Sequence, residues 1–386
     1  MLLLRALPTL LVLLWCAAPA SAGVWLSGDL HVHTTYSHDV WGGPADDNTP
    51  LEDFYTFGQT VEEDFLVARV RGMDFVAITD HNDIRSVTDP GFGSHGVIGI
   101  PGYEASLKGH GQMLGATRTY DAGDASPAAV RAMFEALRAD GGILQANHPV
   151  EPKWSYDYAD VPADTMEAWN LPWFYEPPLP ASNDHEAGLR VWQDLLDRGA
   201  QIGATGGSDS HWKATLAGQG PGQPTTWVYA AEPTMRGVLD GLRAGHTSVS
   251  AQPPGLGGAR VFLEGRLDGL WSAMPGDTIA PGTPLRVRVS GAPGATVKVL
   301  GDRGRELLSA AVTGPEFSAE LTAPADATYA FAEVVGEDRP AERRQLCQAV
   351  PVLELDGRTT LCRNRIGMLA LTSAIYFAPP RLPELP

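Results

Sequence analysis

The stretch that decides the fold is WLSGDLHVHTTYSHD (Trp25–Asp39), a short, mostly apolar strand that runs into two alternating histidines. Side chains two positions apart on a strand point to the same side, so His31 and His33 would present their imidazoles together. Four further segments place histidine or acidic residues at or just after an apolar run: FVAITDHN (Phe75–Asn82), GYEASLKGHGQ (Gly102–Gln112), ILQANHP (Ile143–Pro149) and GGSDSHW (Gly206–Trp212). The five segments hold seven of the chain's ten histidines, which predicts one shared site.

The residue types in these segments predict a metal cluster. Imidazole and carboxylate together are the ligands that borderline-hard divalent metals prefer, and one ion takes about three to five of them. The five segments offer about nine such groups, counted on the chemistry of these ligands. That number predicts two or three ions, which would supply their own nucleophile as a bound hydroxide.

The front half of the chain alternates strand and helix patterns. Thr60–Glu63 reads as a capping box that opens a helix ending near Gly72, and Ser126-Pro127 opens another that ends at Gly141-Gly142. Further helices are expected at Ala187–Arg198 and Thr234–Ala244, and strands at Phe75–Thr79, Ile143–Ala146 and Gln201–Thr205. This order predicts a parallel sheet with crossover helices, with the candidate ligands at the carboxyl ends of the strands.

The back half has a different pattern. Ala251–Gly258 is rich in Gly and Pro and reads as a linker. Short β-rich runs follow at Pro284–Val289, Thr296–Leu300, Glu316–Leu321 and Thr328–Val334. They predict an antiparallel sandwich. The expected division is a signal peptide at 1–22, a metallohydrolase domain at 23–250, the linker at 251–258, a small all-β sandwich-like domain at 259–377 and a Pro-rich tail at 378–386.

The net charge, the N-terminal segment and the cysteines indicate the class of partner and the cellular compartment. The net charge of −18 argues against a nucleic-acid partner. Arg5, the apolar run Leu10–Ala18 and the small-residue site Ala20-Ser21-Ala22 predict a cleavable leader, hence a periplasmic or secreted protein without a membrane span. In such a compartment Cys347 and Cys362 are expected to form a disulfide, the alternative being two buried thiols.

The five segments, in this order, resemble the signature blocks of the PHP family of metal-dependent hydrolases, and most closely its CehA/McbA branch. The resemblance runs from about Trp25 to about Ser250. It implies a distorted seven-stranded β/α barrel. It also implies hydrolysis of ester bonds, with manganese, zinc or iron as the expected ions.

The family pattern also divides the ligands among three metals. His31, His33, Glu104 and Asp209 would hold the first, Glu104, His110 and His148 the second, and Asp39, His81 and His211 the third. Glu104 would be the bridge, and Glu104, Asp209 and Asp80 are the expected catalytic positions, with Asp80 orienting an imidazole. The family's first block commonly ends Ser-Asp, whereas this chain reads Ser37-His38-Asp39, so either His38 or Asp39 could be the ligand; Asp39 is favoured.

The substrate is less sharply defined. Phosphoesters of small molecules are the leading expectation, and carbamate or carboxyl esters of aromatic alcohols are the alternative that the branch implies. A dense aromatic segment, Trp154–Tyr175, either lines an apolar pocket above the metals or packs against neighbouring helices. Lys153, Trp154 and Lys213 are the candidate substrate contacts, with Arg85 behind them. The alternative outside the enzymes is a non-catalytic surface protein that binds metal or another ligand.

Overall fold

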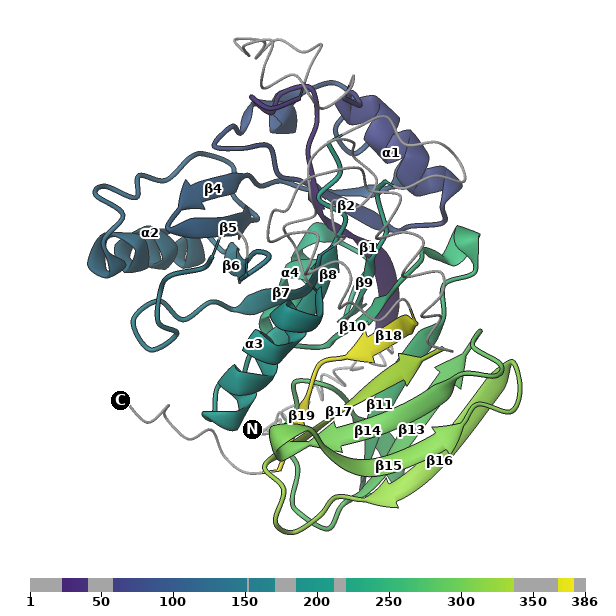
Figure 1. Ribbon diagram of the computed structural model, residues 1–386. Helices are drawn as coiled ribbons and strands as arrows, with labels where there is room; N and C mark the ends of the chain where they lie inside the picture. The colour runs from purple at the N-terminus through teal and green to yellow at the C-terminus, as the bar shows by residue number, and fades with distance from the viewer. Residues whose placement is uncertain are drawn as a thin grey trace, which may run out of the picture.

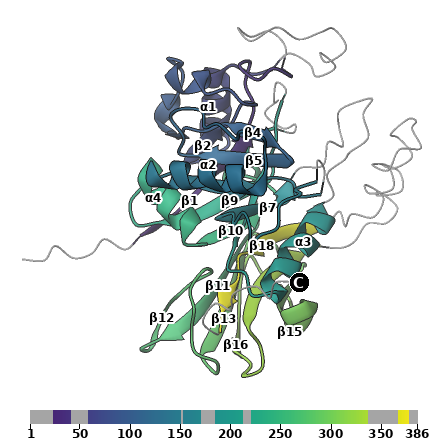
Figure 2. The ribbon, with the colours of Figure 1, turned by 90° about the vertical axis from the view of Figure 1, so that its left-hand side faces the viewer.

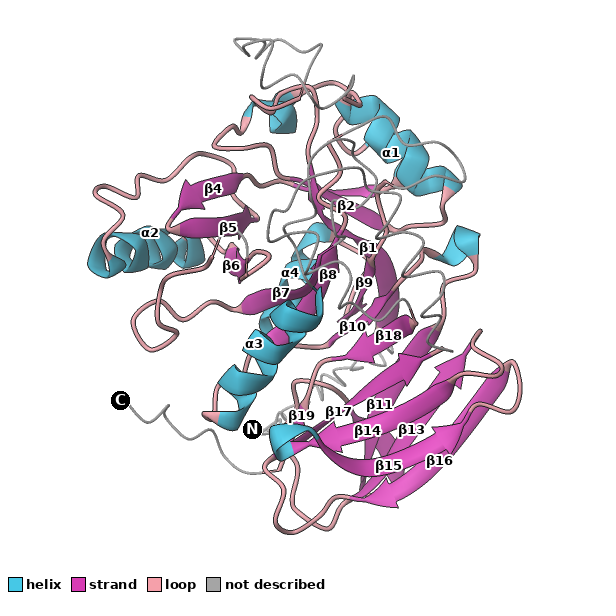
Figure 3. Ribbon diagram, viewed as in Figure 1, coloured by secondary structure: helices cyan, strands magenta, loops and turns pink. Residues whose placement is uncertain are grey.

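The computed structural model describes residues 23–40, 58–150, 153–170, 185–211, 220–336 and 367–377 (Figure 1). The expected leader, Lys213, the pair Cys347 and Cys362, and the Pro-rich tail lie outside these residues. The chain has a mixed α/β fold with several sheets and few helices; in Figure 3 the helices gather in one half of the molecule and the other half is almost entirely strand.

Four α-helices are described: α1 (Val61–Val70), α2 (Pro127–Ala139), α3 (His185–Asp197) and α4 (Met235–Arg243). The predicted capping box is confirmed, since the Thr60 hydroxyl accepts from the Glu63 amide and the Glu63 carboxylate accepts from the Thr60 amide. The predicted cap at Ser126, before Pro127, is also confirmed, because the Ser126 hydroxyl accepts from the Ala129 amide. No helix among the described residues is long and apolar enough to cross a bilayer.

The largest sheet has ten strands, in the order β15-β14-β17-β18-β10-β9-β1-β2-β3, with β19 paired to β17. Its strands are β1 (Val24–Val32), β2 (Phe75–Ile78), β3 (Ile98–Ile100), β9 (Thr225–Ala230), β10 (Thr247–Ser250), β14 (Thr296–Gly301), β15 (Arg305–Ala311), β17 (Tyr329–Val335), β18 (Met368–Thr372) and β19 (Ile375–Tyr376). Only β1, β2 and β3 run parallel to one another; the other pairs are antiparallel.

A five-stranded sheet faces the front part of the large one. It consists of β4 (Glu104–Leu107), β5 (Gly109–Leu114), β6 (Ile143–Ala146), β7 (Thr165–Asn170) and β8 (Gly203–Gly207), in that order. Strands β6, β7 and β8 are parallel, while β4, β5 and β6 are antiparallel. The predicted parallel sheet is therefore right only for β1–β3 and β6–β8, because the Leu107–Gly109 turn returns the chain directly as a hairpin.

The predicted closed seven-stranded barrel is not seen among the described residues. The two sheets approach each other at both edges but share only single bridges there, Val32 with Ser210 and His81 with Glu104. Asn82 and Asp209, which adjoin these bridges, have φ values of 50° and 52°. A residue in the left-handed region cannot continue a strand, so the ladders stop where the candidate ligands begin.

The back half is an antiparallel two-sheet arrangement, as predicted. A four-stranded sheet in the order β12-β11-β13-β16 is formed by β11 (Arg260–Leu267), β12 (Leu270–Ala273), β13 (Pro284–Ser290) and β16 (Glu316–Thr322). It shares one hydrophobic core with β14, β17 and β18 of the large sheet. Figure 2 shows these strands beneath the helix-bearing half. The structure adds that β18 pairs with β10, so one sheet runs through both halves of the chain.

Candidate metal centre

The nine predicted metal ligands lie on strands or in the segments that follow them. His31 lies on β1, Glu104 begins β4 and His110 lies on β5. The others lie in the segments after β1, β2, β6 and β8, and Asp39 is the farthest from its strand. The structure brings them into overlapping groups whose possible ligand atoms lie within 4.8 Å of one another: His31, His33, Glu104 and Asp209; His33, Asp39, His81 and His211; His81, Glu104 and His110; and His31, His148 and Glu167. These clusters of His, Asp and Glu are compatible with metal binding.

The first group is formed by His31, His33, Glu104 and Asp209. His31 Nε2 lies 3.1 Å from Asp209 Oδ1 and 3.4 Å from Glu104 Oε2, and His33 Nε2 lies 3.2 and 3.3 Å from the same two oxygens. The two Nε2 atoms are 3.1 Å apart. An ion about 2.0–2.1 Å from each donor would separate them by about 3.3 Å in a tetrahedron and about 2.9 Å in an octahedron. The observed spacings fall in this range.

Hydrogen bonds on the far side of these rings fix which nitrogen faces the group. His31 Nδ1 lies 3.0 Å from Glu167 Oε1, and a carboxylate can only accept, so Nδ1 carries the hydrogen of the neutral ring. The Ser37 hydroxyl donates to Asp39 Oδ1 over 2.7 Å and therefore accepts from His33 Nδ1 at 3.2 Å. The neutral rings of His31 and His33 thus turn two lone pairs toward each other, an arrangement that a cation between them stabilises.

The carboxylate of Glu104 divides its two oxygens between different neighbours. Oε1 lies 3.1 Å from His110 Nδ1 and 3.2 Å from His148 Nε2, and it accepts from Asn147 Nδ2. Oε2 lies 3.1 Å from His81 Nδ1 and close to His31 and His33, yet this buried oxygen has no hydrogen-bond partner among the described residues. A buried carboxylate oxygen without a donor, aimed at imidazole nitrogens, fits a metal ion.

The group formed by His33, Asp39, His81 and His211 contains the position that the sequence left open between His38 and Asp39. Asp39 Oδ2 lies 2.9 Å from His211 Nε2 and 3.2 Å from His81 Nε2. His211 Nδ1 donates to the backbone carbonyl of Asp209 at 2.9 Å, which leaves its Nε2 lone pair facing Asp39. His38 is exposed and belongs to none of the groups, so the structure brings in Asp39 rather than His38.

The charges of the centre perturb one another strongly. Burial would lower the pKa of His31, but neighbouring carboxylates, led by Asp209, raise it well above its ordinary value. Burial would raise the pKa of Glu104, but the surrounding imidazoles, led by His31, hold it well below its usual range. In the same way, neighbouring imidazoles outweigh burial and lower the pKa of Asp209 and of Asp39. The imidazoles and carboxylates of the centre therefore stabilise each other's charged forms, and a bound cation would take the place of the proton on His31.

The candidate ligands differ in their exposure to solvent. The side chains of Asp39 and His110 are 20% and 23% exposed, whereas those of His31 and Glu104 are 0% and 1% exposed. A substrate would reach the cluster past Asp39, His81 and His110.

Asp80 has a different neighbour from the one predicted. It is buried, and its oxygens accept from the Thr34 amide at 2.6 Å and from the Thr34 hydroxyl at 3.0 Å. These hydrogen bonds secure the turn after β1, and none of the hydrogen bonds of Asp80 among the described residues goes to an imidazole. Burial raises the pKa of Asp80.

The carboxylate that contacts the Nδ1 side of the His31 ring is Glu167, which sequence reasoning missed. It lies on β7, in the run TMEAWN, which contains no histidine. The one available signal is a charged residue between Met166 and Ala168, inside a strand that is buried throughout.

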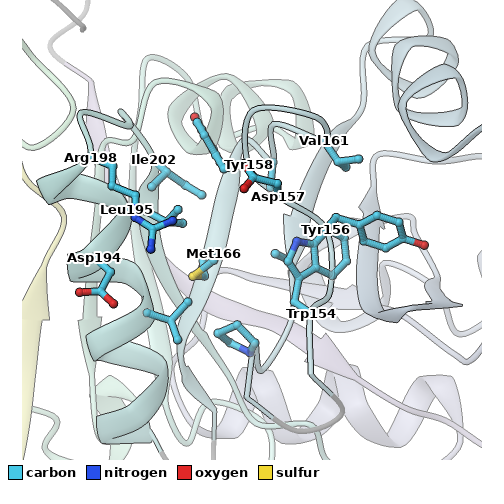
Figure 4. A pocket seen from close by; sticks show the side chains of 14 residues that line it. Trp154, Tyr156, Asp157, Tyr158, Val161, Met166, Asp194, Leu195, Arg198 and Ile202 are labelled. Carbon is cyan, nitrogen blue, oxygen red and sulfur yellow. The ribbon is translucent and has the colours of Figure 1, made fainter. Parts of the chain in front are cut away.

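The candidate substrate contacts lie elsewhere or outside the described residues. Trp154 lines a cavity of about 250 Å³, together with Tyr156, Tyr158, Met166, Leu195 and Ile202 (Figure 4). Met166 and Glu167 are neighbours on β7, so this cavity lies on the face of the sheet opposite to the metal centre. The predicted pocket above the metals is therefore wrong for Trp154. Lys153 is exposed.

Comparisons with known proteins give limited matches. A family model described as "Protein of unknown function (DUF3604)" matches residues 21–90. No curated protein matches the chain. Two solved structures resemble it, one from Bacteroides vulgatus described as a two-domain protein containing a predicted PHP-like metal-dependent phosphoesterase, and one from Bifidobacterium adolescentis described as a candidate metal-dependent phosphoesterase.

The Bacteroides structure has a TM-score of 0.43 and 14% sequence identity, and the alignment covers 82% of this chain and 91% of that one. The Bifidobacterium structure has a TM-score of 0.32 and 15% identity, with coverage of 50% and 90%. These values are too low for either likeness to decide the function, which must be inferred from the geometry of the centre.

Proposed function

We propose that this protein is an exported hydrolase that uses two or three divalent metal ions and cleaves phosphoesters of small molecules, in the manner of the CehA/McbA branch of the PHP family. The observation that carries the proposal is the convergence of His31 Nε2, His33 Nε2 and Glu104 Oε2 on one buried point without a hydrogen bond for that oxygen. A purely structural network would place a donor there.

The residues would share the ions as follows. His31, His33 and Asp209 would hold one ion, His110 and His148 a second, and Asp39, His81 and His211 a third. Glu104 would bridge the first two through its separate oxygens, since it contacts both sets and a carboxylate lowers the repulsion between two cations. The imidazole and carboxylate set, without thiolates, suits manganese, iron or zinc.

Bound ions would supply an activated water and would stabilise the charge that develops on the substrate. The chain contributes the rest. Its buried side holds the ligands rigidly, and its open side, at Asp39, His81 and His110, admits the substrate. Phosphoesters are preferred over aromatic carbamates because the aromatic cavity at Trp154 faces away from the centre.

The experiment is a substrate panel on the full-length protein. Aryl phosphate monoesters and diesters, aryl acetates and aryl carbamates would be assayed with manganese and with zinc, beside chelator-treated protein as the control. Metal-dependent cleavage of a phosphoester is the expected result. Cleavage of carbamates or acetates alone would replace the substrate class, and metal binding without any turnover would favour a non-catalytic binding protein.

The division into domains is also part of the proposal. We place the catalytic residues in 23–250 and treat 259–377 as a β-sandwich-like domain that contributes no ligand, since the segment after Gly257 contains no histidine. Export rests on the leader at 1–22.

A further inference from the structure

We propose that Glu167 is a positioning residue of the metal centre, which sets the tautomer of His31 and fixes the segment that carries His148, and is not itself a ligand. This inference rests on the proposed function, because it assumes that His31 and His148 bind metal. Glu167 is 1% exposed and lies on β7, between the two parallel neighbours β6 and β8.

Both oxygens of Glu167 are already occupied. Oε1 accepts from His31 Nδ1 at 3.0 Å. Oε2 accepts from the backbone amide of His148 at 3.0 Å and from Asn170 Nδ2 at 3.0 Å. Glu104 differs, because its Oε2 has no donor among the described residues. A carboxylate that receives three donors is suited to hold other groups in place.

The contact with His31 has a chemical consequence. Because the carboxylate only accepts, the neutral ring must keep its hydrogen on Nδ1 and turn the Nε2 lone pair toward Asp209 Oδ1, 3.1 Å away. The contact with His148 acts on the backbone. It ties the end of β6 to the same carboxylate, so Glu167 sets the spacing between one ligand of the first ion and one ligand of the second.

The neighbouring strand leaves room for this contact. Gly207 on β8 lies against it, and a Cβ added there would overlap both Glu167 Oε1 and the Cβ of His31. Any larger residue at 207 would therefore push the two side chains apart. The glycine at 207 is thus explained by the packing of Glu167 against His31.

Glutamine cannot replace Glu167 in this role. If its oxygen faces His31, its amide hydrogens face the His148 amide and Asn170, which are also donors. If the amide is reversed, it donates to His31 Nδ1 and moves the ring hydrogen to Nε2, where it would block the metal. Aspartate keeps the charge and both acceptors but is one methylene shorter, so Glu167→Asp should retain part of the function.

The test measures metal affinity in the full-length protein, by competition between the protein and a chelator for zinc and for manganese. Glu167→Gln is expected to weaken binding by about 10- to 100-fold while the number of ions bound at saturation stays that of the wild type. The metal affinity of Glu167→Asp should lie between those of the wild type and Glu167→Gln. In metal-free Glu167→Gln, at a pH high enough to keep the His31 ring neutral, the ¹⁵N chemical shifts of that ring should report the Nε2–H tautomer.

The matched control is Asp64→Asn, a carboxylate-to-amide change at another buried side chain, which contacts Gln59 and none of the candidate ligands. Its metal affinity should equal that of the wild type. Loss of one whole ion in Glu167→Gln at saturating metal would make Glu167 a ligand and overturn the proposal, as would an unchanged affinity.

If Glu167→Gln does not fold, the affinity of Glu167→Asp decides by the same criteria. If the wild type itself binds no metal, the proposed function fails and this inference fails with it. If the wild type binds metal and the Glu167 variants bind it with the same affinity, this inference is overturned and the proposed function stands.

Discussion

The side-chain amide of Asn147 donates to Oε1 of Glu104 over 2.7 Å, and it thereby determines which oxygen of that carboxylate is left for the imidazoles of the first group. Asn147 is itself held by Gln145, whose amide donates to it at 3.2 Å. A layer of neutral, buried amides therefore lies beneath the charged ligands and sets their directions.

Replacing Asn147 by alanine should loosen this arrangement. Without its donor the Glu104 carboxylate can rotate, and we expect metal affinity to fall about 10- to 100-fold with an unchanged number of sites. Chelator competition measures the affinity. An affinity equal to that of the wild type would show that His110 and His148 suffice to orient Glu104.

Replacing Glu104 by glutamine should abolish turnover, with a loss of more than about 100-fold. The loss of a ligand shared by two ions should cost more than the loss of a residue that only orients a ligand, such as Asn147. A neutral amide can neither bridge two cations nor offset their charge. Activity is measured beside the thermal melt of the metal-free protein, which should still show a folded chain. Substantial remaining turnover in a folded variant would exclude Glu104 as the bridge.

Metal binding should release protons at neutral pH. Burial would lower the pKa values of His31 and His148, but nearby carboxylates raise both, so these rings hold protons that a metal must displace. Affinity should therefore fall as the pH is lowered. Calorimetric titration in two buffers of different ionisation enthalpy measures the released protons, and identical heats in both buffers would contradict the prediction.

The same pKa shifts predict how the stability of the metal-free protein depends on pH. A histidine with a raised folded-state pKa stabilises the fold below its unfolded pKa, and this contribution is lost as pH rises through the folded value. The lowered pKa of Asp209 has the opposite sign, so its contribution is lost as pH falls through its folded value. Urea denaturation of chelated protein should thus show stability declining above neutral pH, and a steady rise there would count against it.

Ser373, in the turn between β18 and β19, should support the catalytic half. Its hydroxyl accepts from the Ala204 amide on β8 at 2.7 Å and contacts the Thr247 hydroxyl. Ser373→Ala leaves a buried amide without its acceptor, and we expect a loss of about 1–3 kcal/mol in the free energy of unfolding. Ser318→Ala, on the exposed face of β16, is the control and should change stability little. Metal content should be the same in both.

The grouping of the candidate ligands could be predicted because its signal is local. In four of the five segments a strand leads into His or Asp, and neighbouring strands present their ends together. His31 and His33 could even be assigned to one side from their spacing. Glu167 could not, because its role depends on the packing of β7 against β1 and β6, and nothing near it in the sequence marks a metal site.

The parts of the fold that were missed are long-range. β10 pairs with β18 through Ser248 and Thr372, which are far apart in the chain, and no local pattern specifies that partner. The front sheet was expected to be parallel because strands and helices alternate, but the turn at Leu107–Gly109 is too short for a crossover and makes a hairpin. In the described parts of the chain, the two sheets do not join into a barrel, and the left-handed backbone at Asn82 and Asp209 gives a local reason.

Asp209 joins two of the proposed sites through different parts of one residue. Its carboxylate faces His31 and His33, while its backbone carbonyl accepts from His211 Nδ1 and directs that ring toward Asp39. An ion that draws in the Asp209 side chain therefore also constrains the carbonyl behind His211. We expect the ions to load cooperatively, so that intermediate occupancies are scarcely populated during a titration.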